Sequence, residues 1–120
     1  MAAQVKISID GKIYHVNLQD NSLAEQLVAI TPFTVDCIRS GEHEYYARLP
    51  KRLQAKDVES TTVGHANGVY FFEDWNAISL VFCNCNTAPY KIHHIGDFVE
   101  DISVLLDKSG RTIRITCELE

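Results

Sequence analysis

Apolar and polar residues alternate along much of this chain, and this alternation limits its fold more than any other feature. It runs through residues 5–9 and resumes over residues 12–18. A period of two residues is typical of a strand that buries one face. Asp10 and Gly11 separate the two runs and suit a two-residue type I′ turn. We therefore predict a β-hairpin over residues 4–18.

Further short runs predict more strands. They cover residues 34–38, 44–49, 69–72, 77–83, 90–95 and 112–119. The pair around residues 69–83 is the most apolar part of the chain, so we expect central strands there. Residues 51–63 are polar and without a period, and we interpret them as an exposed loop.

Two segments change to the period of a helix. Ser22 and Glu25 match a capping box in front of an apolar stripe, which predicts a helix over residues 23–30. Asp97 can cap a second helix, which we place at residues 97–107. Seven or eight short strands with two short helices indicate a mostly β protein, either a barrel or a closed sandwich.

Length and composition agree with one ordinary globular domain. The chain has 120 residues, which fits a single domain over residues 1–120. Its formal net charge of −5 gives no general attraction to phosphate backbones or anionic lipids, so we expect neither nucleic acid nor membrane as a partner. The first residues enter a strand pattern without a leader pattern, which predicts a cytoplasmic protein.

The order of the segments is familiar. A hairpin leads into SLAEQLVAITPF, then a strand ending in EYYARLP, then the aromatic pair VGHANGVYFFEDWNAISLVF, and IGDFVEDISVLL precedes the last strand. This arrangement resembles the cyclophilin-like family of small, largely uncharacterised prokaryotic proteins. The resemblance covers nearly the whole chain, and it implies a closed eight-stranded β-barrel with a helix at each end.

The resemblance does not imply prolyl isomerase activity. True cyclophilins carry an Arg near a Phe-Met-x-Gln-Gly-Gly-Asp signature, whereas the only methionine here is Met1 and the chain has no Gln-Gly-Asp run. Members of the small family usually have Gly-Asp before the aromatic strand, where this chain has Gly64-His65. Fold alone does not fix an activity.

The cysteines and histidines give only a weak indication of a metal site. Cys83 and Cys85 would share one face of a strand, and thiolates with imidazole suit zinc. His93 and His94 are adjacent on a predicted strand and point to opposite faces, so at most one of them could join the cysteines. The spacing lacks the two-residue gap common in structural zinc sites, so we expect no metal and no other cofactor.

Aromatic residues supply the better candidate for a binding site. Trp75 lies in the predicted turn after Tyr70, and Arg48 lies near the end of a predicted strand. A ring at a barrel mouth with nearby polar groups is typical of a ligand pocket, although the same residues could simply be core and turn. We predict ligand contacts from Arg48, Tyr70 and Trp75.

Three functions remain open from the sequence. The first is a non-catalytic module that binds a small molecule or a peptide, since no recognisable catalytic motif is present. The second is an assembly module, in which the outward-facing residues of the aromatic strands form an interface, with a homo-oligomer as one form. The third is a weak prolyl isomerase, which rests on fold analogy alone.

Overall fold

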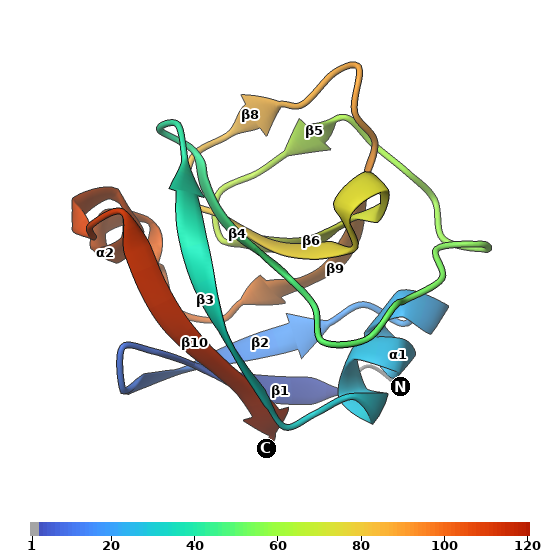
Figure 1. Ribbon diagram of the computed structural model, residues 1–120, viewed down its shortest axis with the longest axis horizontal. Helices are drawn as coiled ribbons and strands as arrows, with labels where there is room; N and C mark the ends of the chain where they lie inside the picture. The colour runs from blue at the N-terminus through green and yellow to red at the C-terminus, as the bar shows by residue number, and fades with distance from the viewer. Residues whose placement is uncertain (1–2) are drawn as a thin grey trace.

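The computed structural model describes residues 3–120, and eight of its strands close into an antiparallel barrel (Figure 1). Around the barrel their order is β1-β10-β3-β4-β7-β6-β9-β2. These strands are β1 (Gln4–Ile9), β2 (Lys12–Leu18), β3 (Phe33–Ser40), β4 (Glu44–Arg48), β6 (Gly68–Phe72), β7 (Ala77–Val81), β9 (Ile92–Phe98) and β10 (Thr112–Leu119). The closed eight-stranded barrel that we predicted is confirmed.

The first hairpin is also confirmed. Asp10 and Gly11 connect β1 to β2 with φ angles of 49° and 92°. Two successive positive φ angles are the requirement of a type I′ turn. Ile9 pairs with Lys12 directly at the turn, so the strands begin pairing without an intervening loop.

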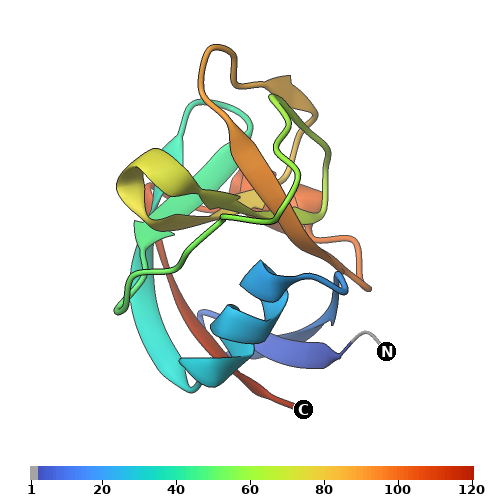
Figure 2. The ribbon, with the colours of Figure 1, turned by 90° about the vertical axis from the view of Figure 1, so that its right-hand side faces the viewer.

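The barrel encloses one apolar core, to which both helices contribute. Inward side chains such as Ile7, Tyr45 and Phe71 are fully buried. Leu27 from α1 (Ser22–Ala29) and Leu106 from α2 (Ser103–Lys108) join the same cluster. Figures 1 and 2 show the two helices on opposite sides of the barrel. None of the helices within residues 3–120 is long and apolar enough to cross a membrane.

The first helix starts with a different cap from the one predicted. Asn21 is its N-cap residue, and the side-chain oxygen of Asn21 accepts a 2.9 Å hydrogen bond from the Ala24 amide. Ser22 is therefore the first helical residue rather than the cap. The Asn21 amide group also donates to the His94 carbonyl, which ties the start of α1 to β9.

The second helix was predicted too long and from the wrong residue. Asp97 belongs to β9, where it pairs with Asn17, and α2 begins only at Ser103. The end of β9 pairs with the neighbouring strand β2, and these tertiary contacts override the local preference for a helix. Near the helix start, the Asp101 carboxylate accepts from the Ser103 amide and hydroxyl.

A small second sheet covers the outer face of the aromatic strands. It consists of β5 (Val63–Gly64) and β8 (Cys85–Asn86), which Figure 1 shows above β6. A Cβ on Gly64 would lie 3.5 Å from Val81 and 3.6 Å from Ile92, so β5 packs directly on that face. The outer cluster under this sheet comprises Tyr70, Phe72, Ala77, Val81 and Ile92.

Two expectations about exposure are therefore wrong. All residues of β6 and β7 are buried, so the aromatic strands present no outward-facing row for assembly. The segment at residues 51–63 is not fully exposed, because Leu53 and Ala55 enter the main core and Val63 begins β5. Both errors have one physical cause: the chain outside the barrel strands packs against the barrel, so it covers the aromatic strands and buries some of its own apolar residues.

Candidate functional site

The short connection between β6 and β7 presents a partly exposed tryptophan. Trp75 is the last residue of a 3₁₀ turn, η1 (Glu73–Trp75), as expected for a turn position. Its ring stacks on that of Phe72, with centroids 4.7 Å apart and an angle of 8° between the planes. Phe72 is buried, so it provides a fixed support, whereas Trp75 remains 45% exposed.

Two tyrosines complete what we call the aromatic shelf, formed by Tyr46, Phe72, Trp75 and Tyr90. The Tyr46 ring lies 5.8 Å from the Trp75 ring, and the Tyr90 ring lies 6.4 Å from it. Tyr90 is 49% exposed. Such centroid distances fall within the range of favourable aromatic pairs. The shelf is therefore an ordered surface on which Trp75 and Tyr90 remain accessible.

Arg48, one of the three predicted ligand contacts, lies beside the shelf. It pairs with Ala77 across β4 and β7, and it lies two residues after Tyr46, on the same face of β4. The exposed guanidinium makes no hydrogen bond or ion pair with any of residues 3–120. A cavity of about 210 Å³ is lined by Tyr46, Arg48 and Trp75.

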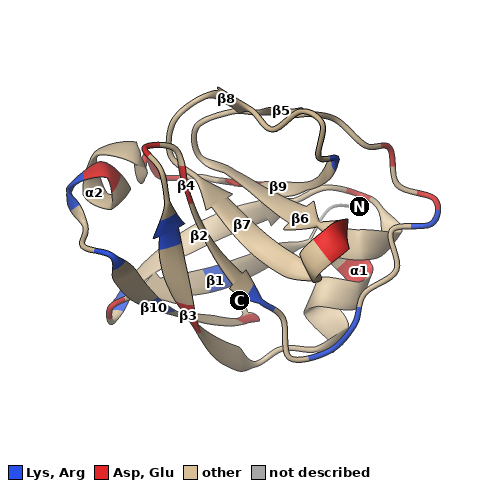
Figure 3. Ribbon diagram, turned by 45° about the horizontal axis from the view of Figure 1, so that its top comes forward, with Lys and Arg blue, Asp and Glu red and all other residues tan. Residues whose placement is uncertain are grey.

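A second cavity adjoins the first and shares two of its residues. It has a volume of about 280 Å³, and its lining consists of Arg48, Leu49, Arg52, Asp74, Trp75 and Asn76. The two arginines and one carboxylate leave a net positive lining. Figure 3 shows acidic and basic segments interspersed over the ribbon.

Asn76 holds this second cavity in shape. It has a φ of 50°, and its side chain donates to the Lys51 carbonyl and accepts from the Leu53 amide, each at 2.9 Å. Its own carbonyl accepts from the Leu49 amide. These bonds fasten the turn after Trp75 to the segment that carries Arg52, so both sides of the cavity are held together.

Tyr70 does not join Arg48 and Trp75. It lies on the same outer face of β6 as Phe72 but is 1% exposed, beneath the β5–β8 sheet. Its hydroxyl accepts a 3.1 Å hydrogen bond from the His65 amide, and burial raises the pKa of this phenol. Tyr70 thus supports other residues from beneath and offers no surface to a ligand on the shelf.

The structure also separates His93 from the cysteines. The Nδ1 of His93 lies 3.1 Å from the Val58 carbonyl, and its Nε2 lies 3.7 Å from a Glu73 carboxylate oxygen. Cys83 is exposed, and Cys85 packs against the outer cluster. Within residues 3–120, the one grouping of three potential metal ligands contains neither cysteine and consists of His65, His94 and Asp97.

This grouping was missed from the sequence. The Nε2 of His94 lies 2.9 Å from Asp97 Oδ1, and the Nε2 of His65 lies 3.4 Å from the same oxygen. The two imidazole rings meet edge to face with centroids 5.2 Å apart. The closeness of His94 and Asp97 in the sequence could have indicated this grouping. It did not, because residues three apart lie on opposite faces of a regular strand.

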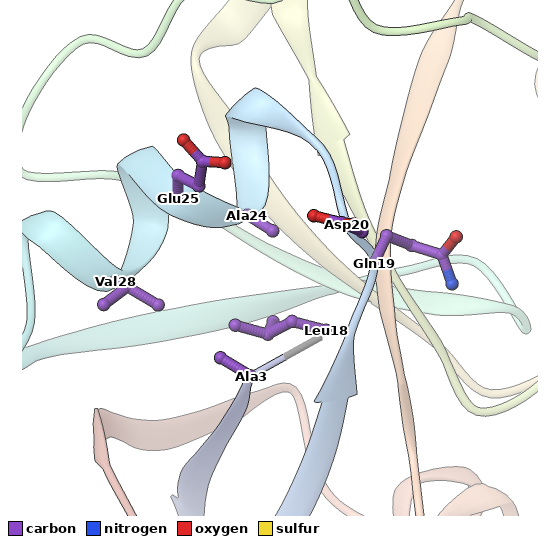
Figure 4. Close-up of a pocket in the computed structure, with 7 residues that line it drawn as sticks. All are labelled: Ala3, Leu18, Gln19, Asp20, Ala24, Glu25 and Val28. Atoms are coloured by element: carbon purple, nitrogen blue, oxygen red, sulfur yellow. The ribbon is translucent and has the colours of Figure 1, made fainter. Parts of the chain in front are cut away.

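Another cavity lies between α1 and β2, away from the predicted site residues. It has a volume of about 220 Å³, and Figure 4 shows Ala3, Leu18 and Val28 around it, with Glu25 at the helix surface. Neither a histidine nor an arginine lines it, and its carboxylates belong to Asp20 and Glu25.

Comparison with known proteins agrees with this architecture. The model of the cyclophilin-like family matches residues 7–118. The chain belongs to the cyclophilin-like family. Among solved structures, this cyclophilin-like protein is similar to a hypothetical protein from Archaeoglobus fulgidus, with a TM-score of 0.76 and 16% sequence identity. The match covers 99% of this chain and 95% of that one, and at this identity it shows the fold alone. No curated protein matches the chain.

Proposed function

We propose that this cyclophilin-like protein is a non-catalytic binding module, whose aromatic shelf holds a small molecule that combines a flat apolar ring with an anionic group. The observation that carries the proposal is the state of Trp75. One face of its ring is stacked on buried Phe72, yet 45% of the residue stays exposed beside Arg48.

The chemistry around Trp75 suits both parts of such a ligand. Aromatic rings bind another flat ring by offset or edge contacts. A guanidinium without a protein partner is suited to a carboxylate or phosphate, because its donors match the oxygens in pairs. Arg48 and Arg52 line the cavity that adjoins the shelf, so the anionic group would lie there.

The cavity sizes favour a small ligand or one terminal group of a peptide. At about 210 and 280 Å³, each cavity is smaller than the roughly 300–1,000 Å³ of typical ligand pockets. The cavities share Arg48 and Trp75, so one ligand can place its ring in the first and its charge in the second. A C-terminal aromatic residue of a peptide has the same two features.

Isothermal titration with matched probes tests this proposal. Phenyl phosphate and benzoate carry a ring and a charge, whereas benzyl alcohol carries the ring alone. We expect saturable binding of the charged probes, weaker binding of benzyl alcohol, and loss of this difference in Arg48→Met. Arg111→Met is the matched control, because it removes an equal charge from an exposed position outside the shelf.

The binding proposal has a clear contrary result. The shelf is not the proposed site if neither charged probe binds the wild-type protein. It is also not the site if Arg48→Met binds the charged probes as tightly as the wild type and the Arg111→Met control do. Trp75→Ala should abolish binding while leaving the barrel folded, because Trp75 lies on an exposed turn rather than in the main core.

A further inference from the structure

We propose that His65, His94 and Asp97 bind a zinc ion and leave one coordination position open. Two imidazole nitrogens and one carboxylate oxygen are a donor set that zinc uses in proteins. The ligand atoms of the three residues lie within 4.8 Å of one another. This site is separate from the aromatic shelf, and neither proposal depends on the other.

A β-bulge brings two of the three ligands to one face. Tyr70 pairs with His94, but the preceding residue, Val69, pairs with Gly96, so β9 contains one extra residue at this point. An extra residue reverses the alternation of side chains beyond it. His94 and Asp97 therefore both point to the outer face, although they are three residues apart.

The third ligand, His65, turns its Nε2 toward the Asp97 carboxylate. Nδ1 of His65 lies 3.2 Å from the Ala66 carbonyl, which can only accept a hydrogen bond. A His65 ring that donates its Nδ1 proton to this carbonyl would offer the Nε2 lone pair to a metal. Such a bond to the second ring nitrogen is the usual way in which a protein orients a metal-binding histidine.

The distances from each imidazole nitrogen to the Asp97 oxygen are close to those around a bound ion. Zinc–nitrogen and zinc–oxygen bonds of about 2.0–2.1 Å place two tetrahedral ligands about 3.3 Å apart. His65 Nε2 and Asp97 Oδ1 are 3.4 Å apart. His94 Nε2 and Asp97 Oδ1 are 2.9 Å apart, which is hydrogen-bond distance, and zinc would replace this contact with a small outward movement of the imidazole.

Neighbouring groups hold the histidines in place. The Tyr70 ring packs against both imidazoles, with centroids 5.8 Å from His65 and 5.1 Å from His94. The Tyr70 hydroxyl accepts from the His65 amide, and Asn21 donates to the His94 carbonyl. Asn84 accepts from the amide of Ala66 and so fixes the turn that carries His65. The ligands are therefore arranged before any metal arrives.

A polar cavity adjoins the proposed site at His94. His94 lines a space of about 350 Å³ together with Gln19, Asn21 and the segment at residues 57–61. Asp57 and Glu59 also line it, so negative charge favours a cation there. Three protein ligands with a fourth position open to water or a small molecule are typical of zinc sites that contact exogenous ligands.

Titration with zinc sulfate alone, followed by calorimetry, tests the site. We expect one equivalent of Zn²⁺ to bind the wild type, and His65→Gln and His94→Gln each to weaken binding about tenfold or more. His15→Gln is the matched control, because His15 also pairs with a carboxylate, that of Glu100 at 2.7 Å. Its affinity for zinc should equal that of the wild type. Circular dichroism would verify that each variant is folded.

Two results would overturn the zinc proposal. One is the absence of zinc binding by the wild type at millimolar zinc. The other is binding that survives in the His65→Gln and His94→Gln variants but disappears in a Cys83→Ser, Cys85→Ser variant, which would assign the ion to the cysteines. Cobalt(II) gives a second readout, since a tetrahedral site with nitrogen and oxygen ligands has an absorption spectrum without the thiolate charge-transfer band.

Discussion

Substitution of Gly68 by Ala tests the packing that holds Tyr70 and His65. Gly68 opens β6 directly after the turn of His65, and it pairs with Asp97 on β9. A Cβ at this position would lie 2.5 Å from Cε1 of Tyr70 and 3.0 Å from the His65 carbonyl oxygen. Tyr70 is fully buried, so its ring cannot move aside without disturbing the outer cluster.

The expected cost of Gly68→Ala follows from overpacking. Forcing an additional methyl group into a packed region typically costs about 1–3 kcal/mol. For a domain of this length, that corresponds to a fall in melting temperature of about 3–15 °C. Gly110→Ala is the matched control, because a Cβ there would meet nothing within 4 Å. We expect its stability to stay within about 0.5 kcal/mol of the wild type.

Chemical denaturation followed by circular dichroism measures the free energy of unfolding of both variants. Repeating the Gly68→Ala substitution in a Tyr70→Ala protein isolates the clash with the Tyr70 ring. Without that ring, the destabilisation by Gly68→Ala should fall to the share caused by the His65 carbonyl. Equal stabilities of Gly68→Ala and Gly110→Ala would refute the reasoning. So would an unchanged cost of Gly68→Ala once the Tyr70 ring is gone.

Two further predictions concern titratable groups. Burial raises the pKa of Cys37 and of Cys117 to about 12, so iodoacetamide at neutral pH should modify the exposed Cys83 before either of them. Mass spectrometry measures the modification of each cysteine, and equal modification of these three would contradict their burial in the barrel core. The hydrogen bond to Glu100 raises the pKa of His15. The His15–Glu100 pair stabilises the fold fully below the ordinary His15 pKa, and this stabilisation is lost as the pH rises through the raised pKa. NMR titration should show a lower His15 pKa in Glu100→Gln than in the wild type. An unchanged His15 pKa would contradict the pairing.

The parts of the fold that the sequence predicted correctly are those decided locally. The 4–18 hairpin depends on Asp10 and Gly11, whose preferred turn matches the twist of its strands. The helix at 23–30 depends on a nearby cap and an apolar stripe, and it forms within one residue of the prediction. Closure of the barrel joins β1 to β10 from opposite ends of the chain. The number of strands left a barrel and a closed sandwich open, and the family resemblance favoured the barrel.

The parts that were missed depend on contacts between distant segments. Asp97 resembles a helix cap in the sequence, but pairing of β9 with β2 makes it part of a strand. The β5–β8 cover buries Tyr70, so only Arg48 and Trp75 of the three predicted ligand contacts lie together. No local pattern reveals the bulge before Gly96 that turns His94 and Asp97 to one face.

The indole N–H resonance of Trp75 offers the most direct test of the aromatic shelf. Trp75 is the only tryptophan in the chain, so a two-dimensional ¹H–¹⁵N spectrum contains a single such signal. Our account predicts that phenyl phosphate shifts this signal in a saturable way, and that Arg48→Met weakens the response whereas Arg111→Met does not. A Trp75 signal that stays unchanged through the titration would contradict the account.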